Sequence, residues 1–252
     1  MKKLTILLTG LLTCTLTISQ TYSSEVSNKG RFEKVLEQLN LTDSVYLEKF
    51  FVEKQLPYYK NVFAMIVPTV VLVENEDEWY YALELNSYIL LVDSAGNIMN
   101  RYYEPKAWTS DAFALESIEI DTSSYYLNDN TIAFGVRVRH EASSSAVPYT
   151  ETTISLFIPR GDSLVQVLRN FTIADQNGEW DLDCEGQFFS KEGILTMSKD
   201  KTNGFNDIIV NYKYSTEIDT EIDGDCISEE NSTYGSETLQ FIDGMYKSNK
   251  KK

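Results

Sequence analysis

Apolar residues recur at every second position over several long stretches of this chain. Three stretches show the pattern, with the apolar residues Trp79, Tyr81, Leu83 and Leu85; Ile132, Phe134, Val136 and Val138; and Ile208, Val210, Tyr212 and Tyr214. A period of two places successive side chains on opposite faces of a β-strand, so one face is buried and the other contacts water. This alternation is typical of antiparallel sheet. A fourth stretch, from Tyr88 to Val92, is continuously apolar.

Turn-forming residues separate these stretches. Gly, Asn, Asp and Ser gather at residues 94–97, 128–130, 160–162, 176–178, 191–193, 203–204 and 243–244, and these residue types favour tight turns. No interval between them carries a helical pattern long enough for the crossover that parallel strands need. The sequence therefore predicts a mainly β protein, an antiparallel meander with a propeller-like or sandwich arrangement.

A helical pattern occurs only near the beginning of the chain. Phe32, Val35, Leu36 and Leu39 are spaced by three and four residues, which predicts an amphipathic helix over residues 31–39. A second helical turn is expected after Thr42 or Asp43, carrying Val45, Leu47, Phe50 and Phe51 and ending before Pro57.

These patterns divide the chain into four parts. We expect a signal peptide over residues 1–19, a helical arm over 20–57, one all-β domain over 58–246 and a basic tail over 247–252. No linker rich in Pro, Gly or Ser interrupts the β-rich part. One β domain is therefore preferred over two.

The first nineteen residues resemble a secretory leader. Lys2 and Lys3 precede an uncharged, largely apolar run over residues 4–18, and Ser19 follows it. A basic start, a short apolar core and small residues before the cleavage site predict a signal peptide. The protein is thus expected to be periplasmic or secreted, with no transmembrane segment in the mature chain. A lipid anchor at Cys14 is the alternative, although Thr13 is larger than the residue that lipoprotein cleavage favours.

The charge of the chain limits its partners. The protein has 38 acidic and 22 basic residues and a formal net charge of −16. Such a charge repels nucleic acid and anionic lipid. A solvated, self-repelling surface is the first interpretation of the charge, and attraction of cations or of a basic protein is the second. We expect no nucleic-acid partner, and a protein or glycan of the cell envelope as the partner. A composition of 42 % hydrophobic and 12 % aromatic residues excludes wholesale disorder.

Two cysteines remain after removal of the leader, Cys184 and Cys226. In an oxidising compartment an isolated pair predicts a disulfide. Two separate buried thiols are the alternative. A disulfide would bring the acidic residues of segment 179–185 next to those of segment 223–229.

The segment from 219 to 230 resembles a calcium-binding loop. An EF-hand loop uses oxygen ligands at positions one, three and five, a glycine at six and a glutamate at twelve. Asp219, Glu221, Asp223, Gly224 and Glu230 occupy these positions. Cys226 stands where an aliphatic residue is expected, and the flanking residues have the pattern of strands. An acidic hairpin that turns at Asp223-Gly224 explains the same residues, so weak calcium binding and a plain hairpin are the two hypotheses.

The sequence contains few residues suited to catalysis. His140 is the single histidine, and no Gly-x-Ser-x-Gly motif accompanies it. A structural or surface role is expected for His140. We predict no catalytic residue and no cofactor beyond the calcium hypothesis, because one histidine also argues against a zinc or copper site.

A short segment is similar to a known repeat. Residues 203–210, with Asn203, Gly204, Asp207 and Ile208, resemble the end of a blade in FG-GAP type β-propellers, where an acidic glycine loop binds calcium. Lys199 and Lys201 stand where that family has its earlier ligands, so the resemblance implies the strand and not the metal. The order of residues in segments 178–184 and 203–207 is also similar to that of uncharacterised exported bacterial β-rich proteins. This resemblance implies no particular activity.

Two functional classes follow from these observations. The leading hypothesis is an exported, non-catalytic binding or interaction protein of the bacterial envelope. The alternative is a carboxylate-based hydrolase acting on glycans or peptides. An enzyme should show a hollow with two inward-facing carboxylates or with His140 beside a nucleophile, and a binding protein should show an exposed aromatic or charged patch. A structural role in the envelope is the third hypothesis.

Overall fold

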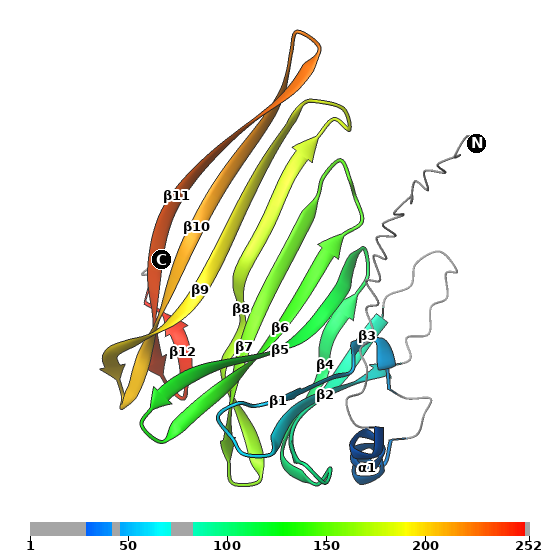
Figure 1. The fold of residues 1–252 in the computed structure, drawn as a ribbon, viewed down its shortest axis with the longest axis vertical. Helices are drawn as coiled ribbons and strands as arrows, with labels where there is room; N and C mark the ends of the chain where they lie inside the picture. Colours follow the sequence, from blue (N-terminus) through cyan, green and yellow to red (C-terminus); the bar gives the residue numbers. More distant parts are fainter. Residues whose placement is uncertain (1–28, 42–45, 72–82, 250–252) are drawn as a thin grey trace, which may run out of the picture.

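The fold is a large twisted sheet with one helix against it (Figure 1). The computed structural model describes residues 29–41, 46–71 and 83–249. The predicted leader, Cys14, Trp79 and Tyr81 lie outside the described residues, as does the end of the basic tail. No helix within the described ranges has both the length and the apolar character needed to cross a membrane.

The elements follow one another in a simple order. Helix α1 (Lys29–Leu39) and a 3₁₀ turn, η1 (Glu48–Phe50), come first. The strands are β1 (Val52–Gln55), β2 (Val62–Val71), β3 (Leu83–Asp93), β4 (Ile98–Ser110), β5 (Phe113–Asn128), β6 (Thr131–Ala142), β7 (Tyr149–Arg160), β8 (Ser163–Trp180), β9 (Gly186–Thr202), β10 (Phe205–Ile222), β11 (Asp225–Ile242) and β12 (Met245–Ser248). The predicted mainly β class is confirmed.

Two antiparallel meanders form the sheet. Strands β1 to β4 pair in order, and strands β5 to β12 pair in order. Arg101 of β4 and Ser163 of β8 join the two meanders through one parallel residue pair. The predicted antiparallel meander is therefore confirmed. The single parallel pair is not predicted by the sequence, because the alternation of apolar residues does not indicate which distant strands pair.

The two meanders pack face to face across the main core. Its residues come from both of them: Phe50, Leu56, Ala64, Ile66, Leu85, Ile89, Leu91 and Trp108 from the first, and Leu115, Ile118, Ile120, Phe134, Val136, Val138, Phe157 and Leu164 from the second. The alternation predicted for residues 132–138 explains why β6 contributes Phe134, Val136 and Val138 to this core. The apolar face of each layer covers the other, as in a sandwich.

Helix α1 covers the outer face of β2 and β3. Phe32, Val35 and Leu36 of the helix pack on Met65, Val67, Leu90 and Val92. Strand β3 is thus buried on both faces, which explains its continuous apolar run. Gly96, in the turn after β3, has φ +81° and faces the Arg31 backbone, and an added Cβ would lie 3.1 Å from the Arg31 carbonyl oxygen. The helix predicted over residues 31–39 is confirmed.

The end of the predicted helical arm differs from expectation. Residues 48–50 form a single 3₁₀ turn, and Val52–Gln55 is strand β1, paired with β2 through Val52 and Ile66. The expected cap at Thr42 or Asp43 lies outside the described residues. Pairing with β1 provides hydrogen-bond partners for the backbone N–H and C=O groups along the outer edge of β2. This pairing outweighs the local helical pattern.

Two predicted turns are wrong. Residues 176–178 lie inside β8 and residues 191–193 inside β9. Gly178 and Gly193 mark close approach of neighbouring groups: a Cβ would lie 2.5 Å from the Phe188 ring at Gly178 and 2.8 Å from the Tyr212 ring at Gly193. Glycine within a strand often has this role. The other five predicted turns are confirmed.

Candidate interaction surface

The hairpins of the second meander reach progressively further from the main core. Figure 1 shows the β6–β7, β8–β9 and β10–β11 hairpins ending at successively greater height. Residues 175–192 and 213–236, from these last two hairpins, form a part of the sheet that we call the distal extension. Strands β10 and β11, each 18 residues long, contribute most of it.

One face of β10 passes from a core into solvent along the strand. Ile208, Val210 and Tyr212 are buried in a second core. Tyr214, Ile218 and Ile222 continue the period of two on the same face, but they are exposed. The neighbours that cover the first half of β10 therefore do not reach the second half.

Five exposed apolar side chains share that face. We call this group the distal apolar row: Phe189, Tyr214, Ile218, Ile222 and Ile227, with exposed fractions of 43 %, 36 %, 41 %, 53 % and 43 %. Phe189 lies opposite Thr216, and Ile227 lies opposite Thr220. Each is thus a diagonal neighbour of the β10 residues of the row, so the five side chains follow one another across three strands.

Carboxylates flank the outer end of the distal apolar row, and a lysine that is ion-paired with Asp175 flanks its inner end: Lys191 lies opposite Tyr214. On the same face, Asp225 lies opposite Ile222 and Glu229 lies opposite Ile218. Residues 214–246 contain nine Asp and Glu and no Lys or Arg. The predicted Tyr212 and Tyr214 stripe located the start of this surface. Ile218 and Ile222 continue the alternation of Tyr212 and Tyr214 along β10. Extending the predicted alternation to these two residues would have identified the rest of the surface from the sequence.

The predicted calcium-binding residues lie in the β10–β11 hairpin. Asp223 and Gly224 form its turn, with φ of 55° and 89°, as a two-residue hairpin turn requires. Residues 219–230 are therefore two strands and a turn, which is the hairpin hypothesis. Asp219 accepts a hydrogen bond from the Ser228 hydroxyl.

Glu230 has a partner of its own on the opposite face from the distal apolar row. Lys213 Nζ lies 3.2 Å from Glu230 Oε1. Its hydrogen bond and charge lower the pKa of Glu230, and Glu230 raises the pKa of Lys213 in return. Within the described ranges, no three His, Cys, Asp or Glu side chains are grouped to hold a metal ion. Calcium binding at Asp219, Glu221, Asp223 and Glu230 remains a prediction.

The predicted cysteine pair links the tip of this hairpin to the turn between β8 and β9. Cys184, in the turn between β8 and β9, and Cys226, in β11, are at disulfide distance, with Cα atoms 5.4 Å apart. Beside them the Glu221 N–H donates to Glu185 Oε1 over 3.0 Å. The acidic turn after β8 is thereby held against the end of β10, as the pairing implied.

The single histidine lines a hollow elsewhere in the molecule, between β4 and strands β5 to β8. The hollow has a volume of about 430 Å³, and its lining includes Asp111, Phe113, His140, Glu151 and Thr172. His140 Nε2 lies 3.2 Å from the Thr109 carbonyl oxygen, and its ring stacks on Phe113. Glu151 Oε1 accepts a hydrogen bond of 3.0 Å from Thr172.

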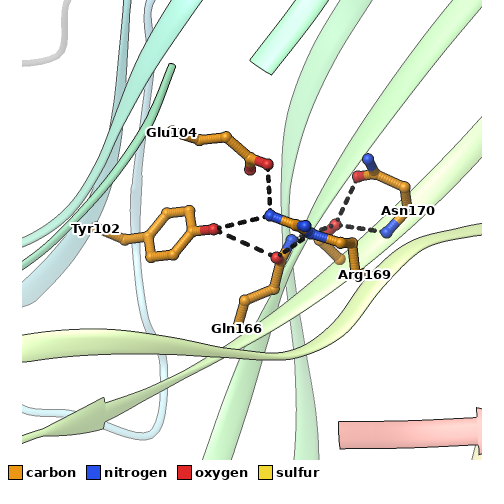
Figure 2. Close-up of polar contacts among 6 residues, drawn as sticks. Tyr102, Glu104, Gln166, Arg169 and Asn170 are labelled. Carbon is orange, nitrogen blue, oxygen red and sulfur yellow. Dashed lines mark hydrogen bonds and ion pairs between the residues drawn. The ribbon is translucent and has the colours of Figure 1, made fainter. Parts of the chain in front are cut away.

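A polar network next to this hollow completes the junction of the two meanders (Figure 2). Arg169 of β8 donates to Glu104 of β4 over 2.7 Å and also reaches the Tyr102 hydroxyl. Gln166 bonds Arg169, and Ser155 bonds Asn170, which lines the hollow. Because β4 and β8 share one backbone pair, these side chains supply much of the contact between the strands.

Comparison of the chain with protein-family models, curated proteins and solved structures finds no match. The resemblance to FG-GAP blades is therefore still a prediction. Asn203 and Gly204 form the β9–β10 turn, with φ of 52° and 83°, and Asp207 is buried at the start of β10.

Proposed function

We propose that the chain is an exported binding protein of the bacterial cell envelope and that the distal extension captures a basic protein partner. The observation that carries the proposal is the distal apolar row, whose outer end is exposed beside Asp225 and Glu229. The one lysine that the described residues place on this face of the distal extension, Lys191, is already paired with Asp175. An exposed apolar group rimmed by polar residues is typical of an interaction site.

The two features of this surface have different roles in binding. Burial of Ile218, Ile222 and Ile227 contributes affinity, at about 25 cal/mol for each Å² of apolar surface removed from water. Asp225 and Glu229 favour a cationic partner and oppose an acidic one. The net charge of −16 extends this attraction over longer distances and accelerates association at low salt.

A synthetic peptide tests the proposal. The probe is a peptide of about ten residues in which Lys alternates with Val, with binding followed by fluorescence anisotropy. We expect salt-sensitive binding that weakens about tenfold in Ile218→Ser or Ile222→Ser, a loss of about 1.4 kcal/mol.

The control lies on the opposite face of the sheet, just outside the distal extension. Ile194 is 71 % exposed there, so Ile194→Ser removes a similar apolar side chain without altering the distal apolar row. A matching peptide with Glu in place of Lys should not bind. Absence of binding by the Lys peptide, or equal losses in all three variants, would contradict the proposed function.

Export is tested separately. Removal of residues 1–19 predicts a mature chain that begins at Gln20, and N-terminal sequencing of protein recovered outside the cytoplasm checks this start. A mature chain that begins at Cys14 and partitions into detergent would instead indicate the lipid anchor. An uncleaved cytoplasmic chain would contradict export.

The His140 hollow supports a second candidate function, carboxylate-based hydrolysis of a glycan or peptide. The specific observation is that Asp111 and Glu151 line the same hollow as His140. If the hollow is catalytic, Glu151→Gln should abolish hydrolysis of a substrate that the wild type cleaves, while Ile218→Ser leaves it unchanged. Retention of activity in Glu151→Gln would exclude this candidate.

A further inference from the structure

The outer edge of β11 has no strand of the described residues beside it over most of its length. Among the described residues, β12 pairs with β11 from Leu239 to Ile242, and β10 pairs with its other edge throughout. Residues 225–236 are exposed at every position. An edge of this kind presents N–H and C=O groups, at every second residue, that have no partner strand.

Apart from the carboxylates of Asp225, Glu229 and Glu230, this edge lacks the features by which sheets usually prevent pairing. Register along β10 and β11 is unbroken from the Ile222–Asp225 pair to the Ile208–Leu239 pair, so no bulge disrupts it. Residues 225–236 contain no Pro, Lys or Arg. Short strands, bulges, prolines and lysines are the common protective devices.

The end strands of the sheet show these devices. Strand β1 has 4 residues, and Lys54 within it donates to the Ile120 carbonyl oxygen across the gap to β5. Strand β12 also has 4 residues and carries Lys247. Strand β5, which pairs with β6 alone among the described strands, is long, but its pairing is interrupted by three register shifts. A long and regular edge is therefore found at β11 among the described edge strands.

We propose that a partner protein adds an extended segment to this edge as a further antiparallel strand along residues 225–236. The inference rests on the proposed function and specifies how the partner binds. Main-chain hydrogen bonds would supply affinity, and alternate side chains would supply specificity.

The side chains beside the edge specify the chemistry of that segment. On one face, Ile227 of β11 lies near Ile218 and Ile222 of β10. On the other face, Glu217 lies opposite Glu230, which is paired with Lys213. Asp219 lies diagonal to Glu230. Two carboxylates on this face, those of Glu217 and Asp219, are therefore not paired with a lysine in the described residues. Because a strand directs successive residues to opposite faces, the segment that fits alternates apolar side chains with Lys or Arg.

A second copy of this chain fits the edge less well. Its own residues 225–236 bring Asp225, Glu229 and Glu230 and no basic side chain. Each copy also carries a net charge of −16, so association of two copies works against their mutual repulsion. A basic partner is therefore the occupant that we infer.

N-methylated peptides test the strand pairing. An added strand uses the N–H groups of alternate residues on one of its two edges. Two versions of the Lys-Val peptide are methylated at alternate backbone nitrogens, one version in each frame. We expect one version to lose at least tenfold in affinity and the other to bind like the unmethylated peptide.

Amide hydrogen exchange of the protein provides the second measurement. Binding of the unmethylated peptide should slow exchange at alternate residues of 225–236, with no such pattern on β12. If the peptide binds but both methylated versions bind equally and β11 amides are not slowed, the strand inference is wrong while the proposed function stands.

Two other outcomes are separable from these. Absence of peptide binding overturns the proposed function and this inference with it. A concentration-dependent dimer in sedimentation, with slowed β11 amides in the protein alone, would identify a second copy as the occupant and overturn the inferred partner.

Discussion

Cys184 and Cys226 join the turn after β8 to the start of β11 across the end of β10. Their Cα atoms are 5.4 Å apart, and 42 positions separate them in the sequence. The Glu221 N–H donates to Glu185 beside this link. The bond therefore holds together the part of the molecule that has the least core beneath it.

Removal of this bond should destabilise the protein. The chain-entropy estimate for a closed loop of this size is roughly 4 kcal/mol. We expect the Cys184→Ser, Cys226→Ser double variant to unfold at lower denaturant concentration than the oxidised wild type. Reduced wild type should behave like the variant, and equal midpoints for all three forms would contradict the prediction.

Asp121 should make stability depend on acidic pH. Burial opposes its ionisation, but hydrogen bonds from Ser123, Tyr125 and Arg137 outweigh burial and hold its pKa below the ordinary 3.8. Arg137 contributes bonds of 2.8 and 2.6 Å. Since the folded pKa is the lower one, the stabilisation is complete above about pH 4 and decreases as pH falls through the folded pKa.

Asp121→Asn tests this dependence. We expect a loss of about 2 kcal/mol at neutral pH, as for hydrogen bonds to a charged group, and a smaller difference from wild type near pH 2. Asp129→Asn, in the exposed β5–β6 turn, is the control. Urea unfolding at both pH values measures the differences, and a constant gap across this range would refute the assignment.

The ion pair of Arg31 and Glu53 should be costly to break. Both side chains are buried, and the Arg31 guanidinium lies 3.7 Å from the centroid of the Phe63 ring. Glu53→Gln would remove the carboxylate with which the buried Arg31 guanidinium pairs, at a cost of about 3 to 5 kcal/mol. The double variant Arg31→Met, Glu53→Leu should recover much of that loss in thermal unfolding. A double variant no more stable than Glu53→Gln would show that the charge pair is not the cause.

The sequence predicts the elements better than it predicts their exposure. Alternation identified β6 and β10, and the spacing of Phe32 and Val35 identified α1. The alternating pattern of β10 does not show that Tyr212 is buried while Tyr214 is exposed. The exposure of each side chain depends on whether strands that are distant in the sequence extend far enough to cover it. Gly178 illustrates a second limit of sequence-based prediction. The residues just before it, Gln176 and Asn177, have the composition of a turn, but a glycine is needed there because the Phe188 ring of the next strand lies close to its backbone.

Gly178→Ala tests that account of the false turn. A Cβ there would lie 2.5 Å from Phe188 and 2.7 Å from the Gln187 carbonyl oxygen. We expect a destabilisation of about 1 to 3 kcal/mol, as for other overpacked sites. Gly235→Ala, in exposed β11, is the control, because the nearest atom there is 3.2 Å away on the Tyr214 ring. Equal stability of the two variants in urea would contradict close packing at Gly178.

Calcium provides the last test of the β10–β11 hairpin. Asp219 accepts a bond from Ser228, and Lys213 pairs with Glu230. Two of the four predicted ligands therefore have protein partners, and the described residues contain no group of three or more His, Cys, Asp or Glu that could hold an ion. A ligand that binds the folded state alone raises its melting temperature. Weak calcium binding therefore predicts a higher melting temperature in millimolar calcium than in chelator, whereas for a plain hairpin we expect the same melting temperature in both. A rise with calcium that disappears in Asp219→Asn would contradict this expectation and favour the loop-type site, while a rise that persists in that variant would place the ion elsewhere.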